Sequence, residues 1–124
     1  MEGKMKITSF TDLVTWKEAH KLALMIYTAT KTFPKEEMYS LVDQIRRCAV
    51  SISSNIAEGF SRQSQKEKSQ FYYIAKGSLT ELQNQLLVAK DVGYLVKSEF
   101  TPIAEQTVTV HKLLNGLVKS AKDR

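Results

Sequence analysis

The chain has 124 residues, a length typical of one domain, and its 43% hydrophobic and 25% charged residues are those of an average globular protein. One cysteine, Cys48, excludes an internal disulfide and a cysteine-based metal cluster, and we expect it to be a buried small hydrophobic residue. The net charge of +5 permits attraction to nucleic acid or another acidic partner but does not prove it.

The first ten residues, MEGKMKITSF, are charged and lack the apolar core of a signal peptide. No uninterrupted apolar stretch approaches the roughly 20 residues that span a bilayer. We therefore expect a cytoplasmic protein.

The first helix is predicted over residues 12–33, where apolar residues recur every three or four positions. Ser9 and Asp12 resemble a capping pair, and Pro34 ends the run. Its predicted core seam consists of Leu13, Trp16, His20, Ala23, Tyr27 and Thr30, with a second row at Leu22, Met25, Ala29 and Phe33.

The second helix is predicted over residues 36–58. Its seam consists of Met38, Leu41, Ile45, Cys48, Ile52 and Asn55, widened by Val42, Ala49 and Ile56. Gly59 is expected to stop this helix in the left-handed conformation, which glycine adopts without steric cost.

The third helix is predicted over residues 65–92, from a Ser64–Glu67 capping box to a stop at Gly93. The fourth is predicted over residues 98–121, with its start ambiguous between a Ser98 cap and a Thr101 cap followed by Pro102. The expected seams are Tyr72, Ala75, Leu79, Leu82, Leu86 and Ala89 on the third helix, and Ile103, Thr107, Val110, Leu114, Leu117 and Ala121 on the fourth.

Four helices of similar length with short connections predict an all-α fold, an antiparallel up-down-up-down four-helix bundle formed by one domain over residues 1–124. Two of the predicted helices carry apolar residues beyond one stripe. These residues are Leu22, Met25 and Phe33 on the first helix, and Phe71, Tyr73 and Ile74 on the third. The pattern alone supports equally a second buried face, as in an oligomer, and a broad core stripe.

The sequence contains none of the phosphate-binding, zinc-protease or hydrolase motifs, and it lacks the inward Glu and Glu-x-x-His set of a di-metal bundle. We therefore expect a non-enzymatic protein with no cofactor. The most basic zone contains Arg62, Lys66 and Lys68, and Arg46 and Arg47 lie earlier on the second helix. Asp43 is the predicted ion-pair partner of Arg47. A solvated face explains this charge pattern slightly better than direct nucleic-acid contact.

The polar stretch SISSNIAEGFSRQS, residues 51–64, is better explained by packing than by catalysis. Asn55 is expected to be a polar residue on the seam that needs hydrogen-bond partners. Ser51, Ser54 and Glu58 follow Arg47 along an adjacent stripe, where small side chains let a neighbouring helix approach, and Ser78 is the predicted facing residue.

Three blocks of the sequence resemble one known family. They are FTDLVTWKEAHKLALMIYTATKTFP (residues 10–34), with its Leu-x-x-Trp-x-x-Ala pattern through Trp16, YSLVDQIRRCAVSISSNIAEGFSR (residues 39–62) and FYYIAKGSLTELQNQLLVAKDVGYL (residues 71–95). The second block is similar to Q-I-R-R-A-x-x-S-I-x-x-N-I-A-E-G and the third to A-x-G-S-x-x-E-L. The family is the four-helix-bundle proteins encoded in 23S ribosomal RNA intervening sequences.

The resemblance implies a bacterial antiparallel bundle that assembles as a ring-like homopentamer, with nucleic-acid (RNA or DNA) binding or an RNA-associated adaptor role as the proposed activity. The chain is also similar to the accessory variability protein of diversity-generating retroelements, so the alternative is a protein–protein interaction scaffold that presents helices to a partner enzyme such as a reverse transcriptase. Arg46, Arg47 and Arg62 match positions of the family blocks, so the resemblance implies them as candidate contacts. Lys66 and Lys68 are added as candidates because of their positive charge. Ser53 departs from the family pattern, which often has proline there, and this predicts a milder kink.

Overall fold

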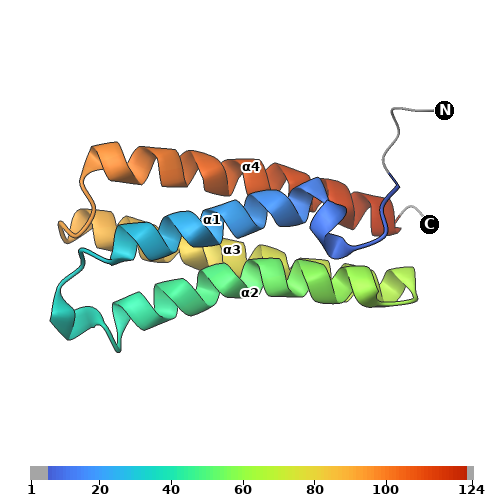
Figure 1. Cartoon of the computed structure of the whole chain (residues 1–124), viewed down its shortest axis with the longest axis horizontal. Helices are drawn as coiled ribbons and strands as arrows, with labels where there is room; N and C mark the ends of the chain where they lie inside the picture. Colours follow the sequence, from blue (N-terminus) through green and yellow to red (C-terminus); the bar gives the residue numbers. More distant parts are fainter. Residues whose placement is uncertain (1–5, 123–124) are drawn as a thin grey trace.

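The computed structural model describes residues 6–122 and consists of helices throughout, with no β-strand in that range. Four α-helices run antiparallel in an up-down-up-down bundle, as the sequence predicts (Figure 1). They are α1 (Val14–Thr30), α2 (Leu41–Ser61), α3 (Gln65–Asp91) and α4 (Lys97–Lys122), and two short 3₁₀ helices are η1 (Phe10–Asp12) and η2 (Lys35–Glu37).

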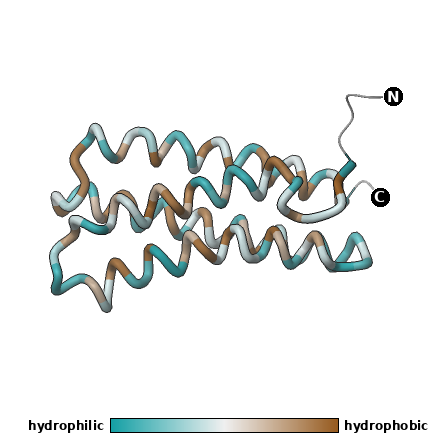
Figure 2. Tube along the Cα trace, viewed as in Figure 1, coloured by the Kyte–Doolittle hydropathy of each residue, from teal (hydrophilic) through white to brown (hydrophobic). Residues whose placement is uncertain are grey.

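The core lies along the bundle axis and is built from the predicted three-four seams. Hydrophobic and hydrophilic residues alternate along every helix, so that each helix buries one face (Figure 2). The predicted α3 seam is buried throughout, and on α4 only Leu117 is partly exposed. The largest fully buried side chains include Leu22, Ile26, Ile45, Ile52, Ile56, Leu79, Leu82, Val110 and Leu114.

The first helix is shorter at both ends than the predicted range 12–33. Ser9 and Asp12 do form a capping pair, since Asp12 Oδ2 accepts the Ser9 N–H at 3.1 Å, but the pair caps η1. The extended backbone at Leu13 separates η1 from α1. At the other end the helix stops at Thr30, and Phe33 enters the core from the connection that follows.

The buried face of α1 is rotated from the predicted seam and consists of Thr15, Ala19, Leu22, Ala23, Ile26 and Thr30. His20 and Tyr27 are therefore exposed, and their prediction as seam residues was wrong. The His20 ring stacks on the half-buried Trp16 indole with the centroids 4.7 Å apart, and Phe10 meets the same indole edge-on at 5.3 Å. Trp16 thus packs at the rim of the core instead of in its centre.

The second helix begins at Leu41, later than the predicted residue 36, and Met38 is exposed before it. Pro34 is followed by η2, which interrupts the helical run. Glu37 Oε1 then accepts hydrogen bonds from Ser40 Oγ at 2.6 Å and from the Leu41 N–H at 3.4 Å. This carboxylate satisfies a free N–H at the start of α2.

Gly59 does not stop α2, which continues to Ser61, so its predicted left-handed role was wrong. The residue is buried against the next helix instead. A Cβ built there would lie 2.6 Å from Tyr72 Cε1 and 3.1 Å from Phe71 Cβ. Glycine fits this position because the buried Tyr72 ring occupies the space that a Cβ would need.

The third helix has the predicted ends to within one residue. Ser64 Oγ accepts the Glu67 N–H at 3.1 Å, and Gly93 adopts φ +91° after the last turn. The Tyr94 N–H donates to Ala89 O at 2.8 Å and the Gly93 N–H to Lys90 O at 3.0 Å, the paired bonds of a Schellman motif.

The fourth helix starts at Lys97, so neither Ser98 nor Thr101 is its cap. Val96 flanks this start: its carbonyl accepts the Glu99 and Phe100 N–H groups, and Glu99 Oε1 accepts the Val96 N–H at 3.4 Å. Pro102 lies inside the helix, beyond the predicted first position.

One hydrogen bond joins the two connections at the end of the bundle where α1 ends and α4 begins. Tyr94 Oη donates to Glu37 Oε2 at 2.9 Å. The bonds from Ser40 and Tyr94 lower the pKa of Glu37, and the bond to Glu37 raises the pKa of the Tyr94 phenol. The α1–α2 connection is thereby attached to the α3–α4 connection.

Replacing Gly59 tests the close approach of α2 and α3. We expect Gly59→Ala to lower the free energy of unfolding by about 1–3 kcal/mol, because the added methyl group overlaps the Tyr72 ring. The matched control is Gly116→Ala on α4, where a Cβ meets nothing within 4 Å. That change should raise stability by about 0.5–1 kcal/mol, since alanine is the better helix former. Equal effects of the two substitutions in urea unfolding would contradict this account.

Candidate nucleic-acid interface

Arg46 lies at the junction of α1 and α2, where it is half-buried. Its Nε donates to Thr30 Oγ1 at 2.9 Å, and its guanidinium lies 4.7 Å from the centroid of the Tyr27 ring. This cation–π contact gives the outward-facing Tyr27 ring a partner. Among the described residues Arg46 forms no ion pair. Its side chain holds two helices together and keeps its charge uncompensated.

Arg47 forms the predicted ion pair with Asp43, one turn earlier on α2. The Nε–Oδ2 distance is 3.3 Å, and 75% of the Arg47 side chain is exposed. An exposed pair of this kind contributes little to stability.

The turn between α2 and α3 uses two of the candidate cations for its own structure. Arg62 Nη2 donates to Glu58 Oε2 at 2.7 Å, and the guanidinium lies 4.6 Å from the Phe71 centroid. Lys68 Nζ donates to Phe60 O at 2.7 Å, where it satisfies a carbonyl at the end of α2. Lys66 is exposed and forms no hydrogen bond or ion pair with the other residues between 6 and 122.

The five predicted contact residues do not form one patch. Arg46 and Arg62 are separated by 16 positions of one helix, which corresponds to about 24 Å. The structure therefore divides them into an arginine pair in the first half of α2 and a second group at the α2–α3 turn.

The second group is enlarged by two lysines that sequence reasoning missed as contacts. Tyr72 packs against Val118 and Ala121, so the last turns of α4 lie beside the first turns of α3 (Figure 1). Lys119 and Lys122, both exposed, belong to those last turns. Their only signal in the sequence was positive charge near a helix C-terminus, which the helix dipole explains equally well. We call Arg62, Lys66, Lys68, Lys119 and Lys122 the basic end.

A polar pocket of about 300 Å³ lies between α2 and α3. Ser51 and Ser78 face each other, as predicted, with 2.9 Å between their hydroxyl oxygens. Asn55 Nδ2 donates to Ser51 O at 2.8 Å, which gives the half-buried seam asparagine the partner it needs. The polar pocket is lined by Gln44, Arg47, Cys48 and Ser51 on α2, and by Ser78, Glu81 and Gln85 on α3.

Cys48 also lines this pocket and is buried, as expected for a small hydrophobic residue. Its Sγ lies 2.9 Å from Ser78 O and donates to it. Burial, together with the charge of Glu81, raises the pKa of the Cys48 thiol to about 12. The group is therefore a neutral thiol at pH 7 and a poor nucleophile.

Alkylation of the native protein tests this protonation state. At pH 8 the thiolate fraction of Cys48 should be on the order of 10⁻⁴, so iodoacetamide should react on the order of 10³-fold more slowly than with an ordinary exposed cysteine. Because the pKa is raised, the rate should grow about tenfold per pH unit up to pH 10. The chain unfolded in urea should react at the ordinary rate, and an equal rate in the native protein would contradict the assignment.

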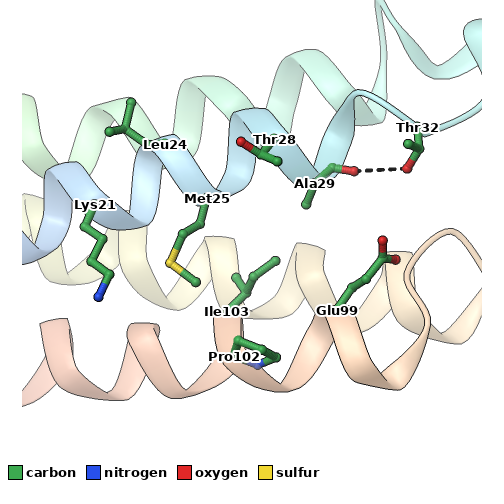
Figure 3. Close-up of a pocket in the computed structure, with 9 residues that line it drawn as sticks. All are labelled: Lys21, Leu24, Met25, Thr28, Ala29, Thr32, Glu99, Pro102 and Ile103. Carbon is green, nitrogen blue, oxygen red and sulfur yellow. Dashed lines mark hydrogen bonds between the residues drawn. The ribbon is translucent and has the colours of Figure 1, made fainter.

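An apolar groove of about 560 Å³ runs between α1 and α4. Met25 and Ile103 point toward each other across it, with Lys21 and Glu99 near its two ends (Figure 3). Another groove, of about 300 Å³, lies between α3 and α4 and includes Leu87 and Val108. The bundle therefore presents apolar surface on both sides of α4.

The comparisons with known proteins agree with this architecture. The family model of the 23S rRNA-intervening sequence protein matches residues 11–116. The chain belongs to this family. No curated protein sequence matches it.

A solved structure shares the fold of this chain. It is the 1.70 Å crystal structure of a protein of unknown function from the S23 ribosomal protein family of Bacteroides thetaiotaomicron. The superposition has a TM-score of 0.79 at 22% identity and covers 86% of this chain and 99% of the other. At this identity the likeness establishes the fold.

The described residues contain neither a membrane-crossing helix nor a metal-binding cluster. No helix between residues 6 and 122 is long and apolar enough to cross a membrane. Within the same range, no three His, Cys, Asp or Glu side chains gather closely enough to hold a metal ion.

Proposed function

We propose that this protein is a cytoplasmic, non-enzymatic, oligomeric bundle that binds nucleic acid through its basic end. The observation that carries the proposal is the packing of the last turns of α4 on the first turns of α3, which brings the segments bearing these five cations to one end of the bundle. Glu58 is the carboxylate that neutralises one of them, Arg62. The remaining positive charge, with a net charge of +5 on the chain, attracts phosphate groups.

The members of the basic end have two different tasks in this proposal. Arg62 and Lys68 are committed to Glu58, Phe71 and Phe60, so they shape the turn. The three exposed lysines, Lys66, Lys119 and Lys122, form no hydrogen bond or ion pair with other residues of the described chain and supply the phosphate contacts. Such contacts recognise the backbone and not the base sequence.

Charge reversal at these lysines tests the proposed interface. The variant Lys66→Glu/Lys119→Glu/Lys122→Glu should bind a labelled structured RNA and a duplex DNA at least tenfold more weakly at 100 mM salt. Its slope of log K against log[salt] should be smaller than that of the unmodified protein by about two to three, because each lost phosphate contact releases roughly one counterion fewer. Fluorescence anisotropy at several salt concentrations gives both quantities.

A matched control separates the basic end from overall charge. Lys17→Glu/Lys31→Glu/Lys35→Glu changes the net charge equally at exposed positions on α1 and in the α1–α2 connection, outside both apolar grooves. This control should retain the salt slope of the unmodified protein. Equal losses in the two triple variants, with both folded by circular dichroism, would place binding outside the basic end. No salt-sensitive binding of the unmodified protein at micromolar concentration would overturn the proposed function.

The proposal includes assembly into a homo-oligomer, for which a pentameric ring is the expected form. A closed ring needs two different complementary patches on each subunit, because its interfaces are heterologous. The grooves on the two sides of α4 supply two separate apolar patches with exposed Leu24 and Val108. Five copies would also multiply the positive field of the chain.

Light scattering tests the assembly and its interfaces. We expect a mass close to five times the 14.1 kDa of the chain, and we expect Leu24→Glu and Val108→Glu each to reduce it, since a buried carboxylate opposes association. Tyr39→Glu is the control, because Tyr39 is 94% exposed and lies outside both grooves. A mass of 14.1 kDa for the unmodified protein would reject the oligomer. The apolar grooves would then favour the alternative function, a scaffold that contacts a partner protein.

A further inference from the structure

A small pocket of about 180 Å³ opens at the basic end, where the first turns of α3 meet the last turns of α4. This Tyr72 pocket is lined by Gln65, Lys68 and Tyr72 on α3, and by Leu117, Ser120 and Ala121 on α4. Pockets that hold whole small molecules measure roughly 300–1,000 Å³. The volume of the Tyr72 pocket therefore suits a single group of a few atoms.

The hydroxyl of Tyr72 has no partner within the fold. The residue is 4% exposed, because its ring packs against Val118 and Ala121 and lies beside Gly59. Its Oη forms no hydrogen bond with another described residue, yet it is not one of the enclosed unpaired atoms of that part of the chain, so it keeps accessible surface at the pocket. Buried tyrosine hydroxyls usually have a hydrogen-bond partner, and a ligand in the pocket can supply it.

Lys68 gives the pocket a positive charge. Its Nζ donates to Phe60 O at 2.7 Å and to Gly59 O at 3.4 Å. An ammonium group has three N–H donors, so one donor remains for a ligand. The two carbonyls do not neutralise the charge, and Lys68 forms no ion pair within residues 6–122. The hydrogen bonds that shape the α2–α3 turn therefore also hold this cation in place.

The other polar groups of the pocket are donors as well. Burial raises the pKa of the Tyr72 phenol, so the group is an O–H donor at pH 7. The Ser120 hydroxyl and the Gln65 amide can each donate, and Gln65 lies at the positive end of the α3 dipole. Lys119 and Lys122 offset the negative end of the α4 dipole. None of the lining residues is acidic, so the pocket is complementary to an oxyanion.

Among oxyanions, the pocket fits phosphate better than carboxylate. A phosphate monoester presents three acceptor oxygens and a charge of about −1.5 to −2 at pH 7, whereas a carboxylate presents two oxygens and one charge. The donors Tyr72, Lys68 and Ser120 come from two helices, and this spread suits a tetrahedral group. A phosphate inside a strand carries a sugar on both sides, but a terminal phosphate carries only one. A pocket of this size therefore suits the terminal group.

We propose that the Tyr72 pocket binds a phosphate monoester, with its oxygens on the Tyr72 hydroxyl, the Lys68 ammonium and the Ser120 hydroxyl. The group comes either from the phosphorylated end of a bound strand or from free phosphate. The first source rests on the proposed function, because the exposed lysines of the basic end then hold the neighbouring backbone phosphates. The lysines attract every strand, and the pocket distinguishes a phosphorylated end from a hydroxyl end.

Strands that differ only at their ends test the first source. One short single-stranded RNA is prepared with a 5′-phosphate, with a 3′-phosphate and with hydroxyls at both ends, and the three compete for the whole protein in fluorescence anisotropy. At least one phosphorylated strand should bind about tenfold more tightly than the hydroxyl strand, because hydrogen bonds to a charged group are the strong ones.

Tyr72→Phe separates the hydroxyl from the packing of the ring. The variant loses no hydrogen bond of the described fold, so its melting temperature should be equal or slightly higher. Its preference for the phosphorylated end should fall by about fivefold or more, and Ser120→Ala should also reduce this preference. Tyr73→Phe is the matched control, because Tyr73 is the neighbouring tyrosine, is exposed and does not line the pocket. The control should keep the full preference.

Free phosphate tests the pocket without any nucleic acid. Melting temperatures are measured in phosphate, in acetate and in chloride at equal pH and ionic strength. Phosphate stabilises folded proteins in general, so the comparison is made between variants. The unmodified protein and Tyr73→Phe should gain more from phosphate than Tyr72→Phe does, because a bound ion adds stability to the folded state. Acetate should affect all three proteins equally.

Each outcome decides the assignment. An end preference that Tyr72→Phe removes supports a strand-end site, and a Tyr72-dependent phosphate effect without an end preference supports a site for free phosphate. The proposal is overturned if neither effect depends on Tyr72, and an equal Tyr72-dependent effect of acetate overturns the choice of phosphate. A Tyr72-dependent phosphate effect in a protein that binds no strand contradicts the proposed function alone. The Lys66→Glu/Lys119→Glu/Lys122→Glu protein should bind all three strands more weakly, so failure of the lysines and failure of the pocket are separately visible.

Discussion

The close contact between α2 and α3 determines much of the remaining structure. Only residues 62–64 connect these two long helices, so the helices must meet immediately after the turn. Gly59 makes this possible because the Tyr72 ring occupies the space that a side chain would need. Further along the same contact, Ser51 and Ser78 are close enough for a hydrogen bond, and the polar pocket opens beside them.

The spacing of apolar residues was sufficient to predict the fold, because burial of one stripe per helix is encoded locally. The same spacing was insufficient to predict which residues at the edges of a stripe are buried. His20 and Tyr27 lie on the predicted seam of α1, yet the helix is rotated and both are exposed. The helix instead buries the neighbouring face with Ala19, Leu22 and Ile26, and Tyr27 finds a partner in Arg46 of the next helix, a contact with no local signature. Gly59 was misread for a similar reason, since its sequence position near a helix end does not reveal the ring of Tyr72.

The candidate site was less predictable, because its parts come from distant segments. Arginines were chosen as free charges, but the fold uses Arg46 and Arg62 to hold neighbouring elements. Lys119 and Lys122 join the α2–α3 turn only through the packing of α4 on α3. Tyr72 looked like an ordinary seam residue, and its unpaired hydroxyl becomes visible only when α4 is packed beside it.

The hydrogen bond from Tyr94 to Glu37 gives this end of the bundle a built-in reporter. Its partners are 57 positions apart, and each belongs to a different connection between helices. Neither connection can form the bond alone, so the bond exists only when both connections are in place. The phenol of Tyr94 therefore reports the assembly of the whole end of the bundle and not the formation of any single helix.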